Sequence, residues 1–92
     1  MQQTILWTYL VEGYGSLFEG VIRSDELYRS PGRAMSAAAD RLYWLFEEQV
    51  PPHFDWTFWQ TPGVSAEPMF RADVQIETQS AYAQVFAMRV VD

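Results

Sequence analysis

The residues best suited to acid–base or metal chemistry are His53, the single histidine, and the carboxylates near it. His53 follows Pro51-Pro52, and Glu47, Glu48 and Asp55 are close in sequence. Imidazole and carboxylate groups together can hold a divalent cation or transfer protons. However, the two prolines restrict this loop, and no residue pattern directs the glutamates towards His53. A small His-dependent or metal-dependent enzyme centred on His53 is therefore an alternative function and not the leading one.

Other catalytic arrangements do not match this sequence. The serines lack a nucleophile-elbow pattern, and without cysteine there is no thiolate nucleophile, disulfide or thiolate zinc site. Gly13-Tyr14-Gly15 is followed by a strand pattern, whereas a dinucleotide motif needs a helix there, and a kinase-type loop needs a lysine that the chain lacks. Asp73 and Glu77 would lie about 13 Å apart on a strand, too far for a glycosidase pair at ~5–9.5 Å. We therefore expect a non-enzymatic protein without a cofactor or metal ion.

The charge of the chain excludes one class of partner and favours another. Twelve carboxylates and six cations, all of them arginine, give a net charge of −6. Nucleic-acid binders need a basic stripe, and none is present, so we expect no direct nucleic-acid contact. The sequence has no run near the ~18 apolar residues of a membrane span and no secretory signal pattern at residues 1–7. We therefore expect no membrane contact and a cytoplasmic location.

The hydropathy pattern predicts five strands and one helix. β-Branched and aromatic content or strict alternation predicts strands at residues 4–12, 17–23, 54–60, 69–78 and 81–91. Turns are expected at residues 13–16 and at Thr78-Gln79-Ser80. The order β-β-α-β-β-β predicts a single α+β domain over residues 1–92. Its antiparallel sheet of about five strands would carry one helix on one face.

The helix is predicted from Ser30-Pro31 to Gln49, since serine can cap a helix and proline suits its first position. Pro51-Pro52 should end it, because a residue before proline avoids helical geometry. Apolar residues recur on one helical face, which should pack on the sheet. These residues are Ala34, Met35, Ala38, Ala39, Leu42, Leu45 and Phe46.

One helix covers one sheet face, yet the first and last strands are apolar on both faces. We expect the second face to pack against another molecule, because large exposed apolar patches mark interaction sites. The aromatic residues behind this expectation are Trp7, Tyr9, Trp56, Phe58, Trp59, Tyr82 and Phe86. A homodimer formed through the uncovered face is one expected outcome. In addition, Glu47 and Glu48 oppose the helix dipole at its C-terminal end. Either arginines from elsewhere in the fold neutralise them, which we favour slightly, or these carboxylates are held for a partner.

The leading hypothesis is a non-enzymatic, acidic protein-binding module whose partner is a protein with a basic surface. Small acidic α+β chains without catalytic groups are common among phage and mobile-element proteins. By this analogy, the chain would inhibit host machinery, as anti-CRISPR proteins do, through steric block or nucleic-acid-mimicking charge. The other alternative is a structural or assembly homo-oligomer. The candidate partner-binding residues are Glu12, Glu19, Glu47, Glu48, Asp55, Trp56, Trp59, Asp73 and Glu77.

Overall fold

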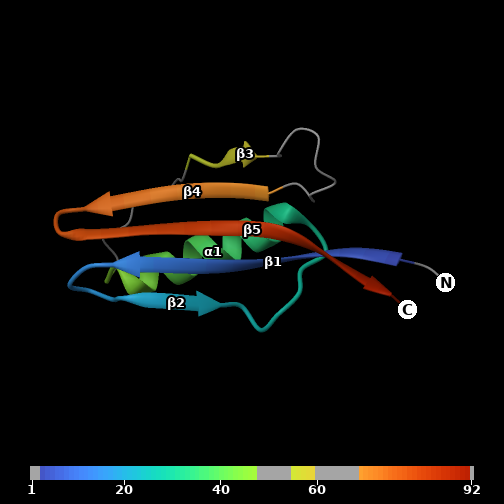
Figure 1. The fold of residues 1–92 in the computed structure, drawn as a ribbon, viewed down its shortest axis with the longest axis horizontal. Coiled ribbons are helices and arrows are strands. Elements are labelled where there is room, and N and C mark those ends of the chain that lie inside the picture. The colour runs from blue at the N-terminus through green and yellow to red at the C-terminus, as the bar shows by residue number, and fades with distance from the viewer. Residues whose placement is uncertain (1–2, 48–54, 60–68, 92) are drawn as a thin grey trace.

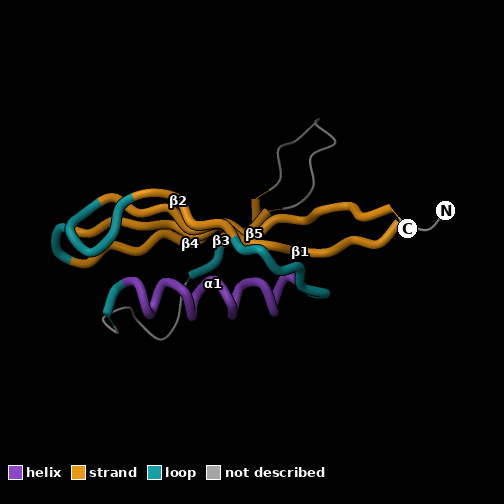
Figure 2. Tube along the Cα trace, turned by 90° about the horizontal axis from the view of Figure 1, so that it is seen from below, coloured by secondary structure: helices purple, strands orange, loops and turns teal. Residues whose placement is uncertain are grey.

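Five strands form one antiparallel sheet, and a helix lies along one of its faces (Figures 1 and 2). The computed structural model describes residues 3–47, 55–59 and 69–91. In chain order the elements are β1 (Gln3–Tyr14), β2 (Gly20–Arg23), α1 (Pro31–Leu45), β3 (Thr57–Trp59), β4 (Met69–Ile76) and β5 (Gln79–Val91). The strands lie in the order β2-β1-β5-β4-β3, and all neighbouring strands are antiparallel. The α+β class and the β-β-α-β-β-β order predicted from the sequence are confirmed.

Helix α1 begins as its sequence indicates. The Ser30 hydroxyl accepts a hydrogen bond from the Arg33 N–H at 3.2 Å, and Pro31 is the first helical residue. Ala34, Ala38 and Leu42 are buried at four-residue spacing, so one stripe of the helix faces the sheet. Two of these three residues are alanines, whose small side chains let the first half of α1 approach β1 and β5 closely.

The helix ends earlier than its sequence predicts. It stops at Leu45 and not at Gln49, and Glu47 has a left-handed φ of 55° that turns the chain away from the helix axis. The Phe46 and Glu47 N–H groups still donate to the carbonyls of Leu42 and Trp44. Phe46 is fully buried, and burial of its side chain favours reversal of the chain directly after it. The prolines expected to end the helix, Pro51 and Pro52, lie outside the described residues.

Both hairpin connections differ from the predicted ones. β1 continues through Gly13 to Tyr14, and β2 begins only at Gly20, so Leu17 and Phe18 belong to a loop and not to a strand. The β4–β5 turn consists of residues 77 and 78, because Gln79 already pairs with Ile76. The strand predicted at 69–78 therefore ends at Ile76, and the last strand begins at Gln79 instead of residue 81. Of the described residues within the predicted strand 54–60, residues 57–59 form β3.

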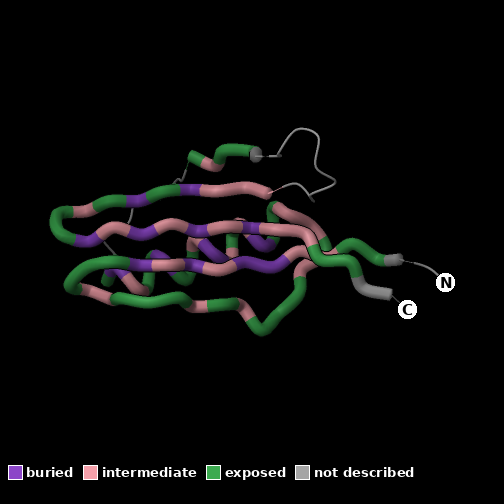
Figure 3. The backbone as a smooth tube through the Cα atoms, in the orientation of Figure 1, coloured by how far each residue is buried: buried purple, intermediate pink, exposed green. Residues whose placement is uncertain are grey.

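The core lies between α1 and one face of the three central strands. Figure 3 shows buried positions along β1, β5 and β4, as expected where one face of a strand is covered. Across these strands Val11 faces Ala83 and Ala83 faces Ala72, so the buried residues line up in register. Alternation in the sequence predicts Phe70, Ala72, Val74 and Ile76 on the inward side of this strand, and Ala72 and Val74 are indeed buried in β4.

β1 and β5 are longer than their neighbours and continue together as a two-stranded arm. Beyond the Met69–Phe86 pair of β4 and the Trp7–Tyr28 bridge, the two strands pair with each other and with no other described strand, from Leu6–Met88 to Gln3–Val91. Figure 2 shows this arm extending past the N-terminal end of α1. In the ranges that the structure describes, no helix has both the length and the apolar composition needed to cross a bilayer.

Candidate protein-binding surface

The sheet face opposite α1, here called the open face, is not covered by any described helix (Figure 2). Because Tyr9 and Val11 point towards α1, the even-numbered residues of β1 point to the open face. Residues of β5 and β4 that pair with these even-numbered residues point to the open face as well. The open face carries Leu6, Thr8, Leu10, Glu12, Arg71, Asp73, Tyr82, Gln84, Phe86 and Met88. It therefore combines apolar, aromatic and charged side chains.

The aromatic side chains are divided between the two faces differently from the prediction. Trp7 and Tyr9 lie on the helix side, where Tyr9 stacks on Tyr28 with ring centroids 6.2 Å apart. Phe58 contacts the Phe70 ring at 5.3 Å on that same side. Tyr82 and Phe86 remain on the open face. The open face is consequently less aromatic than the strand sequences suggested.

A connected group of polar side chains crosses the open face near the β4–β5 turn. Glu12, Tyr82 and Asp73 lie in one row over β1, β5 and β4, because Tyr82 pairs with both acidic residues. The hydroxyls of Tyr14 and Tyr82 both donate to the Glu12 carboxylate. Arg71 lies over the Tyr82 ring, 4.2 Å from its centroid, and forms a salt bridge with Asp73 at 3.1 Å. Exposed pairs of this kind contribute only about 0–1 kcal/mol, so their main effect is to orient the carboxylates.

The hydrogen bond to Glu12 raises the pKa of the Tyr14 hydroxyl above its ordinary value, because ionisation would place a phenolate beside the carboxylate. Tyr14 therefore remains a donor at neutral pH. The Glu12 carboxylate accepts hydrogen bonds from two phenol hydroxyls, which hold it beside Tyr82. This arrangement presents a fixed negative charge at the surface.

One end of the molecule carries an excess of negative charge, and we call it the acidic end. The β1–β2 loop, the β4–β5 turn and the C-terminal end of α1 all lie there (Figure 1). Phe18 and Phe46, whose ring centroids are 5.8 Å apart, connect the loop to the helix. The acidic end carries Glu12, Glu19, Glu47, Asp73 and Glu77, and residues 12–20, 42–47 and 73–82 contain no arginine or lysine.

Most of this charge has no salt-bridge partner in the part of the chain that the structure describes. Among residues 3–47, 55–59 and 69–91, no salt bridge joins Glu12, Glu19, Glu47 or Glu77 to an arginine. Asp73 is the exception, because it pairs with Arg71. Asp55 is exposed just before β3. Because Thr57 of β3 pairs with Arg71 of the antiparallel strand β4, Asp55 lies beyond this pair in the direction of Asp73. The structure thus brings together most of the carboxylates predicted to bind a partner.

The other predicted residues have different positions. Trp56 is half-buried and packs against the core, so it supports the fold on the helix side. Trp59 lies in β3, and its side chain is outside the described part of the structure. Glu48 and His53 also lie outside the described residues. Within the described ranges, no group of three or more histidines and carboxylates is arranged to hold a metal ion.

Residues 24–27, between β2 and the Tyr28 bridge, form a hollow of about 300 Å³ on the open face. Leu27, Phe86 and Met88 supply its apolar lining, and Asp25 and Glu26 supply carboxylates. Arg23 also lines it, so the hollow as a whole has a net charge of −1. An apolar floor with carboxylates at its rim suits the long side chain of an arginine or lysine.

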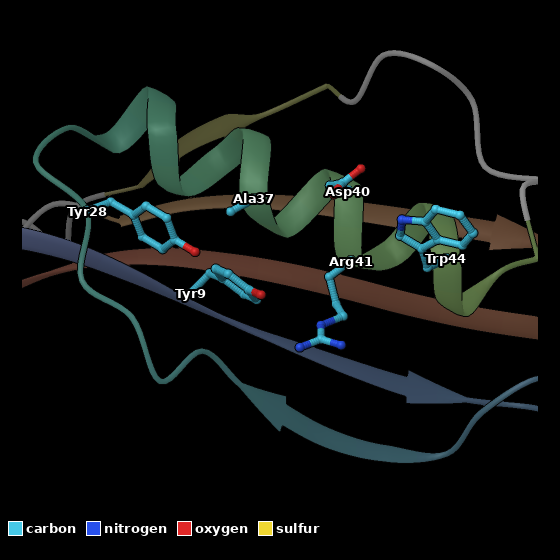
Figure 4. Close-up of a pocket in the computed structure, with 6 residues that line it drawn as sticks. All are labelled: Tyr9, Tyr28, Ala37, Asp40, Arg41 and Trp44. Carbon is cyan, nitrogen blue, oxygen red and sulfur yellow. The ribbon is translucent and has the colours of Figure 1, made fainter.

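A second hollow, of about 280 Å³, lies on the helix side between α1 and the edge of the sheet (Figure 4). Tyr9, Tyr28 and Trp44 line it together with Asp40 and Arg41. Figure 4 shows the Arg41 guanidinium extending towards β2, while the Asp40 carboxylate points the other way. One cation and one anion balance here, so this hollow does not share the negative charge of the acidic end.

Sequence reasoning included Tyr82 among the aromatic residues behind the expected binding face but missed the contacts that organise this surface. Tyr14 and Tyr82 hold Glu12, and Arg71 connects Tyr82 to Asp73. The only signal in the sequence was alternation, which places Arg71 and Asp73 on one side of a strand. Their meeting with Glu12 depends on the pairing of β1 with β5, which joins residues about 70 positions apart.

The backbone at the acidic end yields a prediction. Glu47 and Glu77 have φ values of 55° and 52°, a region that costs an L-residue about 1–2 kcal/mol. Glycine at either site should raise the free energy of unfolding by about 0.5–1 kcal/mol. This is less than the backbone cost removed, because glycine has greater conformational freedom in the unfolded chain. Urea unfolding of Glu77→Gly would measure this. Glu77→Ala is the matched control, because it removes the charge and keeps Cβ. Equal stability of the two variants would contradict the backbone explanation.

Comparisons with known proteins identify no relative. A scan against protein-family models, a search of curated proteins and a search of solved structures each return no match.

Proposed function

We propose that this protein is a non-enzymatic, acidic module that binds a basic surface of another protein through its open face and acidic end. The observation that carries the proposal is the gathering of Glu12, Glu19, Glu47, Asp73 and Glu77 at one end of the molecule, where, among the described residues, only Asp73 forms a salt bridge with an arginine. Two left-handed glutamates within this group support it further, since glycine would be more stable at either site.

The uneven distribution of charge would orient the molecule as it approaches a partner. A surface of one sign attracts an oppositely charged partner over about a Debye length, ~8 Å at physiological salt, and raises the association rate. Arg71 lies beside Asp73, but the other arginines lie away from the acidic end, on α1, at the end of β2, between β2 and α1, and on the arm. A basic partner would therefore approach the acidic end first and then contact the open face.

Apolar contacts on the open face would supply the remaining affinity. Leu27 is 48% exposed and Met88 is 44% exposed, and both line the open-face hollow with Phe86. Contacts that exclude water at the centre of an interface contribute most of its binding energy, while charges at the rim set the rate and the specificity. An arginine or lysine of the partner placed in the hollow would combine an apolar stem contact with ion pairs to Asp25 and Glu26.

The finer proposal is inhibition of a host protein that handles nucleic acid. Such proteins present arginine and lysine to phosphates, and the same groups pair readily with carboxylates. Bound through its acidic end, the chain would cover the nucleic-acid-binding surface of that host protein. It would inhibit the protein by steric block or by mimicking the charge of nucleic acid. This mode of action would be that of an anti-CRISPR-like inhibitor encoded by a phage or mobile element and acting in the host cytoplasm.

The test compares neutralised variants. Glu12→Gln/Asp73→Asn/Glu77→Gln removes three charges from the proposed surface, and Asp40→Asn removes one from α1 as the matched control. We expect the tagged wild-type protein to retain a specific basic protein from host lysate. For the purified pair, the triple variant should raise Kd by about 10–100-fold, since each exposed ion pair contributes ~0.5–1 kcal/mol. Asp40→Asn should leave Kd unchanged.

Two outcomes would contradict the proposal. One is that no basic protein binds the wild-type chain, and the other is that the triple variant binds as tightly as the Asp40→Asn control. The inhibitor mechanism has its own measurement, which is competition with the partner's nucleic acid. Simultaneous binding of the nucleic acid and this chain would reject steric block and charge mimicry, while leaving the binding role intact.

A further inference from the structure

The outer edge of β1 in the arm carries backbone groups that no described strand pairs with. Trp7 exchanges two hydrogen bonds of 2.7 Å with Tyr28, so the Trp7 N–H and C=O point away from β5. Tyr9 follows the same pattern, because its carbonyl accepts from the Ser24 N–H. Alternation along an antiparallel strand places the N–H and C=O of Gln3 and Ile5 on that same outer edge. The pairing of β1 with β2 covers only residues 10–13.

Space for another strand exists beside this edge. A hollow of about 540 Å³ is lined by Thr4, Ile5, Leu6, Leu27 and Arg29, where the chain leaves β1 after the Tyr28 bridge. Ile5 is 49% exposed in this region. Proteins usually protect such an edge with proline, lysine or a bulge, and Gln3–Leu6 contains no proline and no charge. A two-stranded ribbon is also only marginally stable by itself.

We propose that this edge binds a second copy of the chain, with two β1 strands pairing antiparallel about a two-fold axis at Thr4. In this register Gln3 of one copy faces Ile5 of the other, and the reverse pair forms by symmetry. The outward groups of these two residues would make about four backbone hydrogen bonds. The edge is thus complementary to itself, as a closed two-fold dimer requires.

The absence of charge on this stretch of β1 favours a second copy over the basic partner proposed above. In the proposed register Gln3–Ile5 faces the same three uncharged residues of the second copy, whereas the basic partner would bring its cations towards Arg29. Two chains of charge −6 also repel each other, but pairing through the arms keeps their acidic ends at the far ends of molecules that are each 48 Å long.

This inference places self-association at a strand edge and not on the uncovered sheet face, where the sequence led us to expect it. The open face remains accessible in such a dimer, because the two sheets join side by side. The inference is therefore independent of the proposed function, and each can fail without the other.

The experiment is sedimentation equilibrium of the full chain from about 1 to about 300 µM, a range suited to a short strand-edge contact. Ile5→Pro removes the outward N–H without removing a β1–β5 hydrogen bond, because Ile5 does not donate to β5. We expect wild-type protein and the Ile5→Val control to dimerise, and Ile5→Pro to raise the dimer dissociation constant at least tenfold, taking a tenfold change as about 1.4 kcal/mol. Near-UV circular dichroism of the tryptophans checks that the fold is retained.

A wild-type protein that stays monomeric throughout this range would overturn the inference, and so would an Ile5→Pro variant that dimerises as tightly as wild type. If Ile5→Pro loses its near-UV signal, Gln3→Pro takes its place, because Gln3 is the first residue of β1 and its N–H points the same way. Retention of the wild-type dissociation constant by Gln3→Pro would likewise overturn it.

Discussion

Replacing Gln79 by leucine is expected to lower the free energy of unfolding by about 3–5 kcal/mol, because each unsatisfied buried group costs ~1–3 kcal/mol. The Gln79 side chain is only 1% exposed and binds the β1–β2 loop. Its Oε1 accepts from the Leu17 and Phe18 N–H groups at 2.8 and 3.2 Å. Its Nε2 donates to the Phe18 and Ser80 carbonyls, both at 3.0 Å.

Urea unfolding would measure this loss against Gln75→Leu, a matched change at an exposed position of β4. The control should shift stability by less than about 0.5 kcal/mol, as surface substitutions usually do. Since a domain of this size has only about 5–14 kcal/mol in total, Gln79→Leu should also lower Tm markedly. A loss equal to that of the control would show that the Gln79 hydrogen bonds do not hold the loop.

The second large effect is expected at Phe46. Phe46→Ala should lower the free energy of unfolding by about 3–5 kcal/mol, the usual range for a buried aromatic residue. Phe46 is 0% exposed, and its ring packs at 60° to the Phe18 ring. It caps the C-terminal end of α1, so its loss removes the contact joining the helix to the loop that Gln79 holds.

Chemical unfolding and amide exchange along α1 would test this second prediction. Tyr43→Ala is the control, because Tyr43 lies in the same helix and is exposed. We expect the exchange rates of the last helical turn to rise strongly in Phe46→Ala and little in Tyr43→Ala. Similar stability of the two variants would contradict the role assigned to Phe46.

The parts of the fold predictable from sequence are those determined by local patterns. Ser30 and Pro31 identify the start of α1, and the spacing of Ala34, Ala38 and Leu42 identifies its buried stripe. Alternation over residues 70–76 identifies β4 and its inward side correctly. In each case the signal lies within one element and does not depend on distant partners.

The misplaced turn at residues 78–80 has a tertiary cause. Thr78-Gln79-Ser80 is a polar triplet of the kind that turns favour, and burial of a glutamine is unusual. Gln79 is nevertheless buried, because four backbone groups from the loop and from Ser80 satisfy its amide. Since Leu17 and Phe18 are about 60 residues away, no local pattern reveals these partners.

The candidate surface could be predicted in charge but not in arrangement. The absence of cations around Glu12, Glu47 and Glu77 is visible in the sequence. Their gathering at one end depends on β1, β5 and α1 all having an end there (Figure 1). The division of aromatic rings between the faces was not predictable either, because β1 is apolar on both sides. Its inward side is decided by Tyr9 and Val11 packing beneath α1.

The two proposals assign different surfaces to different partners. The acidic end and open face carry carboxylates and exposed apolar side chains, whereas the outer edge of the arm is uncharged and flanked by arginines. A dimer joined through the arms would present two acidic ends, one at each extremity. Binding to a partner with two basic sites would then gain from effective concentration.

The most direct test of the central claim is an NMR titration of the labelled protein with an oligo-arginine peptide, monitoring backbone amide shifts. We predict that the shifts concentrate at Glu12, Asp73, Glu77 and Tyr82 and weaken steeply with added salt, because exposed charges are screened within about a Debye length. Shifts concentrated instead on the helix around Asp40 and Trp44, or no binding at low salt, would contradict the account.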